Sequence, residues 1–338
     1  MLLQLGVPTV VVSSVEAARE FLKTHDMIVA VDLPYTKRVQ SFQFIREEEV
    51  TLLIDSIAQS SSSGSPIDLT ERLMSLTANI ICRIAFGKSF STDFFPYVGR
   101  IVDRLTGHHG RLERSFLEMD GFYERVIEDH LNPGRGFILG WSGHWCNHPT
   151  WAMTELARNP RIMKKAQVEV RNSIGNKGKV TEGDVDQLHY LKMVVKETLR
   201  LHPPAPLLVP RETMSHFEIN GYHIYPKTQV HVNVWAIGRD PNLWKNPEEF
   251  LPERFMDNSV DFRGQHFELL PFGAGRRICP GMYMAIATVE LALANLLYRF
   301  NWNLPNGMRE ADINMEEAAG LTVRKKFALN LVPILHHC

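Results

Sequence analysis

The sequence has no long hydrophobic run, and this absence removes one class of protein at the outset. A helix needs about 18 consecutive apolar residues to cross a bilayer, and no such stretch occurs among the 338 residues. The first residues lead almost directly into a strand-like segment at 7–12. The sequence therefore predicts neither a membrane span nor a signal peptide.

An excess of charge of one sign is also missing. The formal net charge is −1, which gives no reason to expect a nucleic-acid partner. Paired cysteines are absent too, because Cys82, Cys146, Cys279 and Cys338 are widely scattered. Neither a disulfide framework nor a paired-cysteine zinc site is indicated, and a reducing compartment fits. The 44% hydrophobic content is enough for a sizeable core.

Apolar spacing predicts a mainly helical chain with a small β-sheet. A strand at 7–12 precedes a helix capped by Ser14, and a hairpin is expected around Asn220-Gly221. Val230, Val232 and Val234 alternate with polar residues as in a strand. The run Glu47-Glu48-Glu49 is interpreted as a solvated surface. Further helices are predicted at 37–60, 69–86, 112–131, 151–158, 160–174, 188–202 and 280–299, the last apolar nearly all round.

The stretch 271–281, Pro-Phe-Gly-Ala-Gly-Arg-Arg-Ile-Cys-Pro-Gly, places one cysteine at the start of the long apolar helix. Cys279 is expected to be the helix N-cap, with Pro280 at the first helical position. The helix dipole and free N–H groups would then favour an ionised sulfur. Gly273 and Gly275 allow a tight backbone turn beside a flat ligand, and Arg277 offers a fork that matches a carboxylate.

The pattern Phe272-x-x-Gly275-x-Arg277-x-Cys279-x-Gly281 resembles the haem-binding loop of the cytochromes P-450, the haem-thiolate monooxygenases. The resemblance implies a truncated version of that fold, in one domain over 1–338. It implies haem b as cofactor and Cys279 as the axial ligand of its iron. The residues expected to contact haem are Arg211, Pro271, Phe272, Gly273, Gly275, Arg277, Cys279 and Gly281.

Two other motifs extend the resemblance. Glu197 and Arg200 share a helix face, which alone means little, but Pro252-Glu253-Arg254-Phe255 follows downstream. In the family, the residues matching Glu197, Arg200 and Arg254 form a structural triad that fixes the cysteine loop beneath the haem. Arg211, in Pro210-Arg211-Glu212-Thr213, would reach a haem propionate. The turn before it would hang Leu207, Leu208 and Val209 over the haem and shape a substrate pocket, although core packing explains these three nearly as well.

The amino-acid sequences of segments 151–157 and 254–281 are most similar to those of plant microsomal enzymes of specialised metabolism. This implies hydroxylation of an apolar small molecule with O2 and with electrons from NADPH through a membrane-bound reductase. The family location is the cytosolic face of the endoplasmic reticulum membrane, whereas a chain without the family's N-terminal anchor helix could be cytosolic.

The sequence departs from the family in four places. The anchor helix and its proline hinge are absent, only a short junction stands between Ala30 and Lys37, and a stretch between Arg135 and Gly136 is missing. Gly143 and His144 occupy the positions of the acid and threonine that deliver protons to oxygen. We therefore expect little or no turnover from this chain.

Three alternatives stay open. The chain could bind haem without catalysis, as a truncated or mis-spliced product that folds poorly. It could catalyse haem-thiolate isomerisation or dehydration, although the enzymes of that kind have an interrupted cysteine loop and this loop is uninterrupted. His144-x-Cys146-x-His148 could ligate a metal, but the spacing fits no established zinc pattern.

Overall fold

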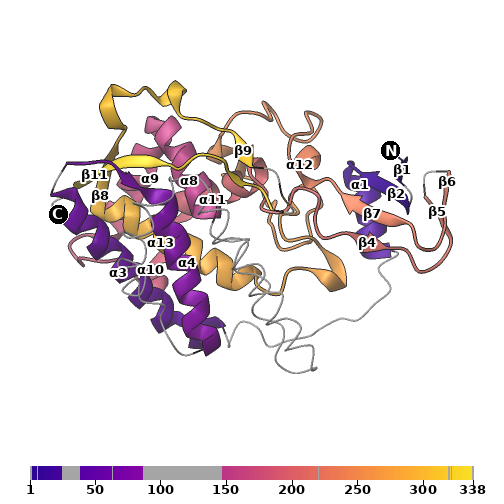
Figure 1. The fold of residues 1–338 in the computed structure, drawn as a ribbon, viewed down its shortest axis with the longest axis horizontal. Coiled ribbons are helices and arrows are strands. Elements are labelled where there is room, and N and C mark those ends of the chain that lie inside the picture. The colour runs from indigo at the N-terminus through magenta and orange to yellow at the C-terminus, as the bar shows by residue number, and fades with distance from the viewer. Residues whose placement is uncertain are drawn as a thin grey trace, which may run out of the picture.

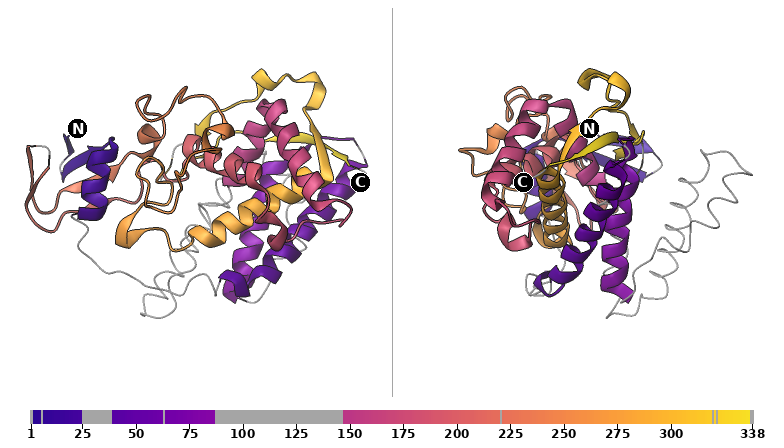
Figure 2. Two further views of the ribbon diagram at one scale, coloured as in Figure 1. Left: turned by 180° about the vertical axis from the view of Figure 1, so that it is seen from behind. Right: turned by 90° about the vertical axis from the view of Figure 1, so that its left-hand side faces the viewer.

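A computed structural model describes residues 2–24, 39–86 and 147–336 of the chain, except positions 6, 63, 220, 319 and 321. Helices fill one end of this part, and a four-stranded sheet lies at the other end, beside the N-terminus (Figures 1 and 2). The longer helices are α3 (Gln43–Ser61), α4 (Leu69–Phe86), α8 (Asn147–Arg158), α9 (Pro160–Ile174), α11 (His189–Leu201) and α13 (Met282–Arg299). The expected mainly helical class is confirmed.

Short helical segments connect these elements. They are α1 (Val15–Arg19), a π-helix at Glu20–Thr24, α10 (Glu182–Val185), α12 (Val234–Ile237), and 3-10 turns at Pro252–Phe255, Gly275–Arg277, Pro305–Gly307 and Glu310–Asp312. The Ser14 side chain accepts a hydrogen bond from the Ala17 N–H at 3.3 Å, which confirms the predicted N-cap. Asp68 likewise accepts from the Glu71 N–H at 3.1 Å at the start of α4.

The strands form four small sheets. The largest has the order β1-β2-β7-β4, built from β1 (Leu2–Leu5), β2 (Val7–Val12), β7 (Gln229–Val232) and β4 (Arg211–Glu212), and β2 and β7 run parallel. The predicted hairpin is confirmed as β5 (Phe217–Ile219) with β6 (Tyr222–Ile224). The remaining strands are β3 (Ile67–Asp68), β8 (Phe300–Asn303), β9 (Glu317–Ala318), β10 (Arg324–Lys325) and β11 (Asn330–Leu335).

Two hydrophobic cores form, and α13 is central to the larger one. Nearly every apolar residue of α13 is buried against α3, α8, α9, α10 or α11, as its all-round apolar sequence predicts. The smaller core packs β2, α1 and β7 against Leu208, Phe267, Leu270 and Ala274. Because Ala274 belongs to the smaller core and Cys279 to the larger one, the segment between them lies where the two cores meet.

Some local predictions are wrong. Val234 begins α12, because the Asn233 side chain accepts from the Ala236 N–H at 3.0 Å and starts a helix there. The Glu47 to Glu49 run is solvated only in part, because Glu48 is exposed whereas Glu49 is buried and pairs with Arg83 of α4 at 2.8 Å. Glu48 pairs with the same arginine, so the run joins two helices.

Several predictions fall outside the described residues. They concern the junction between Ala30 and Lys37, the helix at 112–131, the gap at Arg135, and the positions Gly143, His144 and Cys146.

Candidate functional site

The segment Pro271 to Gly281, called here the cysteine loop, closes on itself by backbone hydrogen bonds. The Cys279 N–H donates to the Phe272 carbonyl at 2.9 Å, and the Ile278 N–H donates to Gly275 at 3.2 Å. Gly273 and Gly275 have φ of 72° and 73°, a left-handed backbone that costs other residues free energy. The loop therefore needs glycine at these two positions, as the sequence predicted.

The Cys279 thiol is buried at the start of α13, but Cys279 is not the helix N-cap. Gly281 is the N-cap, and α13 begins at Met282. The difference arises because Cys279 and Pro280 form a preceding turn, in which the Met282 N–H approaches the Cys279 carbonyl at 3.4 Å. Burial raises the pKa of the Cys279 thiol, whereas hydrogen bonds from the Gly281 and Met282 N–H groups lower it. The sulfur thus faces the free N–H groups of the helix, and burial keeps it a neutral thiol.

The backbone at Gly264 packs closely against the cysteine loop. Gly264 has φ of +77°, and a Cβ there would lie 2.7 Å from the Ile278 Cδ1 and 3.2 Å from the Gly273 oxygen. A larger residue at 264 would push the cysteine loop away. The segment around Gly264 therefore fixes the loop from one side.

The structure brings Glu197, Arg200 and Arg254 together in one buried network. The Glu197 carboxylate accepts from Arg200 Nε at 2.8 Å, from Arg200 Nη2 at 2.8 Å and from Arg254 Nε at 2.9 Å. It also accepts from the Leu251 N–H at 2.8 Å. Glu197 and Arg200 are fully buried, so each charge depends on the others for its solvation.

The arginines of this network hold a length of backbone. Arg200 donates to the carbonyls of Gly238 and Pro247, both at 2.6 Å. Arg254 donates to those of Lys245 at 2.8 Å and Asn246 at 3.2 Å. The network therefore fixes segment 245–251, which leads into the chain that carries the cysteine loop.

Sequence reasoning missed Trp244. Its buried ring lies under both guanidinium groups, with Arg200 Cζ 5.4 Å and Arg254 Cζ 5.9 Å from the ring centroid. A tryptophan ten residues before Arg254 was the available signal, but only the fold shows that the chain turns back between them.

Arg211 and Arg277 lie in different environments. Arg211 is half-buried in β4 and donates to the Ala274 carbonyl of the cysteine loop at 3.3 Å. Arg277 is exposed and, within the described part of the chain, has neither an ion pair nor a hydrogen bond. The structure thus places Arg211 against the loop and leaves the Arg277 guanidinium available to an anion.

The residues of the predicted pocket turn, Leu207, Leu208 and Val209, lie in different environments. Leu208 is buried in the smaller core with φ of 52°, whereas Val209 is 69% exposed and Leu207 is also exposed. Leu208 lies close to the cysteine loop, because a Cβ on Gly273 would lie 3.7 Å from its Cδ1. A leucine in the left-handed region is strained, and its surroundings must hold it there.

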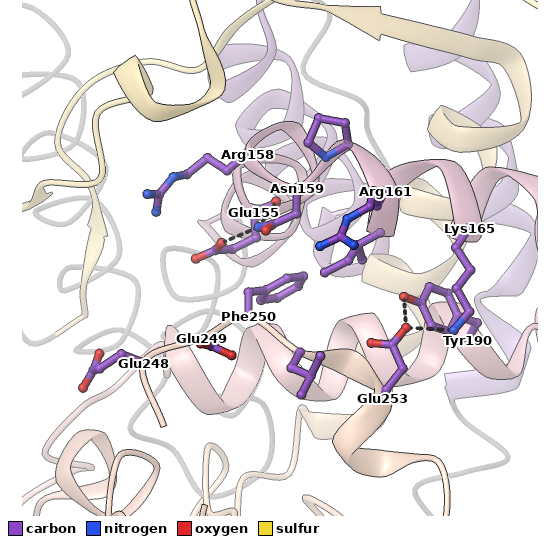
Figure 3. A pocket seen from close by; sticks show the side chains of 13 residues that line it. Glu155, Arg158, Asn159, Arg161, Lys165, Tyr190, Glu248, Glu249, Phe250 and Glu253 are labelled. Atoms are coloured by element: carbon purple, nitrogen blue, oxygen red, sulfur yellow. Dashed lines mark hydrogen bonds and ion pairs between the residues drawn. The ribbon is translucent and has the colours of Figure 1, made fainter. Parts of the chain in front are cut away.

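A pocket of about 780 Å³ lies elsewhere, at the junction of α8, α9, α11 and segment 248–253 (Figure 3). Arg161 and Glu155 reach toward it from the helices, and Phe250 stands opposite. None of the predicted site residues lines it. Among the described residues, no group of three or more His, Cys, Asp or Glu side chains could hold a metal ion.

Comparison with known proteins agrees with this arrangement. The family model for cytochrome P450 matches residues 149–331. The Arabidopsis thaliana proteins cytochrome P450 71B34 and 71B36 are 45% and 43% identical, over 98% and 99% of this chain and 86% of each relative. The first alignment covers 429 positions against 338 residues here, so at least 91 of those positions have no counterpart in this chain.

A solved structure agrees on the fold. A zebrafish cytochrome P450 determined with abiraterone has a TM-score of 0.71 and 21% identity, covering 100% of this chain and 96% of that chain. The sequence relatives and the fold point the same way. The chain belongs to the cytochrome P450 family of haem-dependent monooxygenases.

Proposed function

We propose that Cys279 is the thiolate ligand of haem b, and that the protein acts on an apolar small molecule with O2 and electrons that originate from NADPH. The observation that carries this proposal is the buried Cys279 sulfur, which receives two backbone N–H groups at the start of α13. A thiolate is the axial ligand that favours O–O cleavage when haem is bound. The position and environment of this sulfur suit that role.

The surrounding residues fit haem by charge and by shape. Haem b carries two propionate carboxylates, and two guanidinium groups are available at the cysteine loop: Arg211 donates to the Ala274 carbonyl of the loop, and Arg277 is an exposed residue within it. Gly273 and Gly275 present backbone without Cβ atoms, and Phe272 is a buried aromatic residue. Pro271, Phe272 and Gly281 complete the loop that would face the ring.

Each part of the chain would then have a separate task. Cys279 would hold the iron, and the Gly281 and Met282 N–H groups would stabilise negative charge on its sulfur. Arg211 and Arg277 would orient the propionates. The Glu197, Arg200 and Arg254 network would keep the cysteine loop in register, and Leu207, Leu208 and Val209 would border the substrate.

Metal coordination must remove the thiol proton. Burial raises the pKa of Cys279, so the protein without haem carries the neutral thiol at pH 7. A bound cation reverses this preference, because a coordinating thiol is deprotonated. Haem binding should therefore release a proton.

We infer that turnover is impaired. Gly143 and His144 stand where the family has an acid and a threonine, and neither position lies in the described residues, so this inference rests on the sequence. Proton delivery by positioned side chains contributes about 10²- to 10⁴-fold to a rate. Product formation should be lower than in an intact relative by about that factor.

The redox partner and the location follow from family membership. We infer that electrons arrive from an NADPH-dependent reductase at the endoplasmic reticulum surface. In the ranges that the structure describes, no helix is both long and apolar enough to cross a membrane.

The test of function is a reconstituted assay. Haem-loaded protein is mixed with a plant reductase, NADPH and a panel of apolar aromatic substrates, and product and NADPH oxidation are measured. We expect haem binding with product at least about a hundredfold below a relative such as cytochrome P450 71B34. Turnover equal to that of the relative, and abolished in Cys279→Ala, would refute the impairment while supporting the ligand.

A further inference from the structure

We propose that His202 is a positioning residue, which anchors segment 203–211 to α8 and so holds Arg211 and the pocket turn beside the cysteine loop. The inference rests on the proposed function only for what Arg211 and the turn do. The anchoring itself is a property of the chain without haem.

The His202 side chain is fixed in two directions. Its Nε2 lies 2.7 Å from Glu155 Oε1, with the two side chains 8% and 6% exposed. Its ring stacks on Trp151 with the centroids 4.1 Å apart and the planes 4° apart. A carboxylate can only accept, so Nε2 carries the shared proton. Glu155 and Trp151 both belong to α8, and His202 directly follows α11.

Glu155 is the side-chain partner that holds His202. On the other side of the ring, Nδ1 lies 3.8 Å from Glu317 Oε1, beyond hydrogen-bond distance, and has no hydrogen-bond partner in the described part of the chain. His148, on the same face of α8, is buried and neutral, because burial lowers its pKa to about 3.

Besides the His202 side chain, one backbone hydrogen bond holds the start of segment 203–211, which the Val323 N–H donates to the Pro204 carbonyl at 3.0 Å. Four of residues 203–210 are proline and lack an N–H group. The Leu208 N–H bonds locally to the Ala205 carbonyl at 3.0 Å. The Val232 and Trp235 N–H groups donate to carbonyls of the segment at 3.2 and 3.3 Å.

The far end of the segment is better fixed than its start. Arg211 pairs with Val230 in the β4–β7 ladder. Between the two ends lies the strained Leu208, with φ of 52°, a conformation that persists only when its surroundings over-determine it. At the near end, the side chain of His202 supplies the side-chain restraint, next to the single backbone hydrogen bond between Val323 and Pro204, so losing it should loosen this turn.

Hydrogen exchange followed by mass spectrometry, on the full chain without haem, tests this directly. His202→Phe keeps a ring to stack on Trp151 but cannot donate to Glu155. His202→Gln keeps a donor at a similar reach. His189→Phe, an exposed histidine at the other end of α11, is the matched control.

We expect His202→Phe to speed exchange in 205–212 by about tenfold or more, with β8 and β11 unchanged. His202→Gln and His189→Phe should stay within about twofold of the parent. Acceleration spread evenly over the chain, or none in 205–212, would overturn the proposal. So would His202→Gln behaving like His202→Phe.

A second comparison separates positioning from simple stability. His202→Phe leaves the Glu155 carboxylate buried with a weakened set of partners, which could unfold the protein. The double variant Glu155→Met with His202→Phe removes that charge and should fold. Fast exchange in 205–212 in this folded variant supports the anchor, and exchange restored to the parent rate contradicts it.

Discussion

Glu197 shows what a single residue contributes to this fold. Its carboxylate receives hydrogen bonds from Arg200, Arg254 and the Leu251 N–H without exposure to solvent. Without this carboxylate, the two arginines would be left without their negatively charged partner. Such a residue acts on stability first, and on the cysteine loop through the backbone that its arginine partners hold.

We therefore expect Glu197→Ala to lower the free energy of unfolding by about 3–5 kcal/mol. Asp312→Ala is the matched control, because Asp312 pairs with the exposed Arg309 at 3.2 Å and exposed ion pairs contribute little to stability. Urea titration of both variants measures the difference. Equal losses of unfolding free energy in the two variants would show that the buried network contributes no more to stability than an exposed ion pair.

Glu290 of α13 gives a pH dependence with a definite sign. Burial raises the pKa of this carboxyl from 4.5 to about 7. The negative charges of Asp186 and Asp261 also raise it, whereas the positive charges of Lys192 and Arg263 lower it. The folded state then binds its proton more tightly than the unfolded state does. This contribution to stability is complete below about pH 4.5 and is lost as the pH rises through 7.

Glu290→Gln removes the titration. Relative to the parent, the variant should gain stability between about pH 5 and 8, as measured by the urea midpoint at each pH. Asp184→Asn should show the opposite change of stability with pH. Its parent carboxyl has a lowered pKa, chiefly through Lys177, so that variant should lose stability relative to the parent as the pH rises through about 4. A parallel response of the two variants would contradict the assignment.

Sequence motifs were sufficient for residues whose spacing is fixed by chemistry. Cys279 and its glycines, and the pair Glu197 and Arg200, are recognisable from their spacing in the sequence. Trp244, Glu49 and His202 are not, because their partners lie on other elements and no local pattern marks them. An acidic run such as Glu47 to Glu49 looks solvated until the helix that covers it is known.

At the scale of elements, the cysteine loop depends on how α13 begins. The sequence placed the long helix correctly to within two residues at its start. It misplaced the N-cap, because Pro280 is equally acceptable in the preceding turn and at a first helical position. The consequence is that the sulfur lies beyond the helix end, facing its free N–H groups.

Glycine substitutions test the packing of this loop. Gly273→Ala and Gly64→Ala share a left-handed backbone and ordinary or open surroundings, so each should cost about 1–2 kcal/mol. Gly264→Ala adds approaches of 3.2 Å to the backbone of Gly273 and Ala274, besides one of 2.7 Å to the Ile278 methyl group, and should cost more because the loop backbone cannot move aside as a side chain can. Thermal or urea unfolding ranks the three. If Gly264→Ala loses no more unfolding free energy than Gly64→Ala, the cysteine loop is free to move away from residue 264.

At the scale of the whole molecule, the cysteine loop joins two cores. The helical core contains Cys279 and the sheet core contains Ala274 and Leu208. The mainly helical class followed from apolar periodicity, and the family followed from one motif. The pairing of distant strands such as β2 with β7 did not, because register between segments more than 200 residues apart leaves no local signal.

The chain is shorter than its relatives but keeps their fold. At least 91 aligned positions of a relative are missing here, yet the fold still matches a solved P450 over the whole chain. Helices α8, α9, α11 and α13 and the network around Glu197 form a self-consistent core for the cysteine loop. We therefore expect the ability to bind haem to outlast efficient turnover.

The most direct test is the difference spectrum of the reduced protein with carbon monoxide, recorded after haem supplementation for the parent and for Cys279→Ala. We predict that the parent gives the long-wavelength Soret band of a thiolate-ligated haem, and that Cys279→Ala loses it. A band at shorter wavelength in the parent, a band unchanged by the substitution, or a protein that stays colourless would contradict the account.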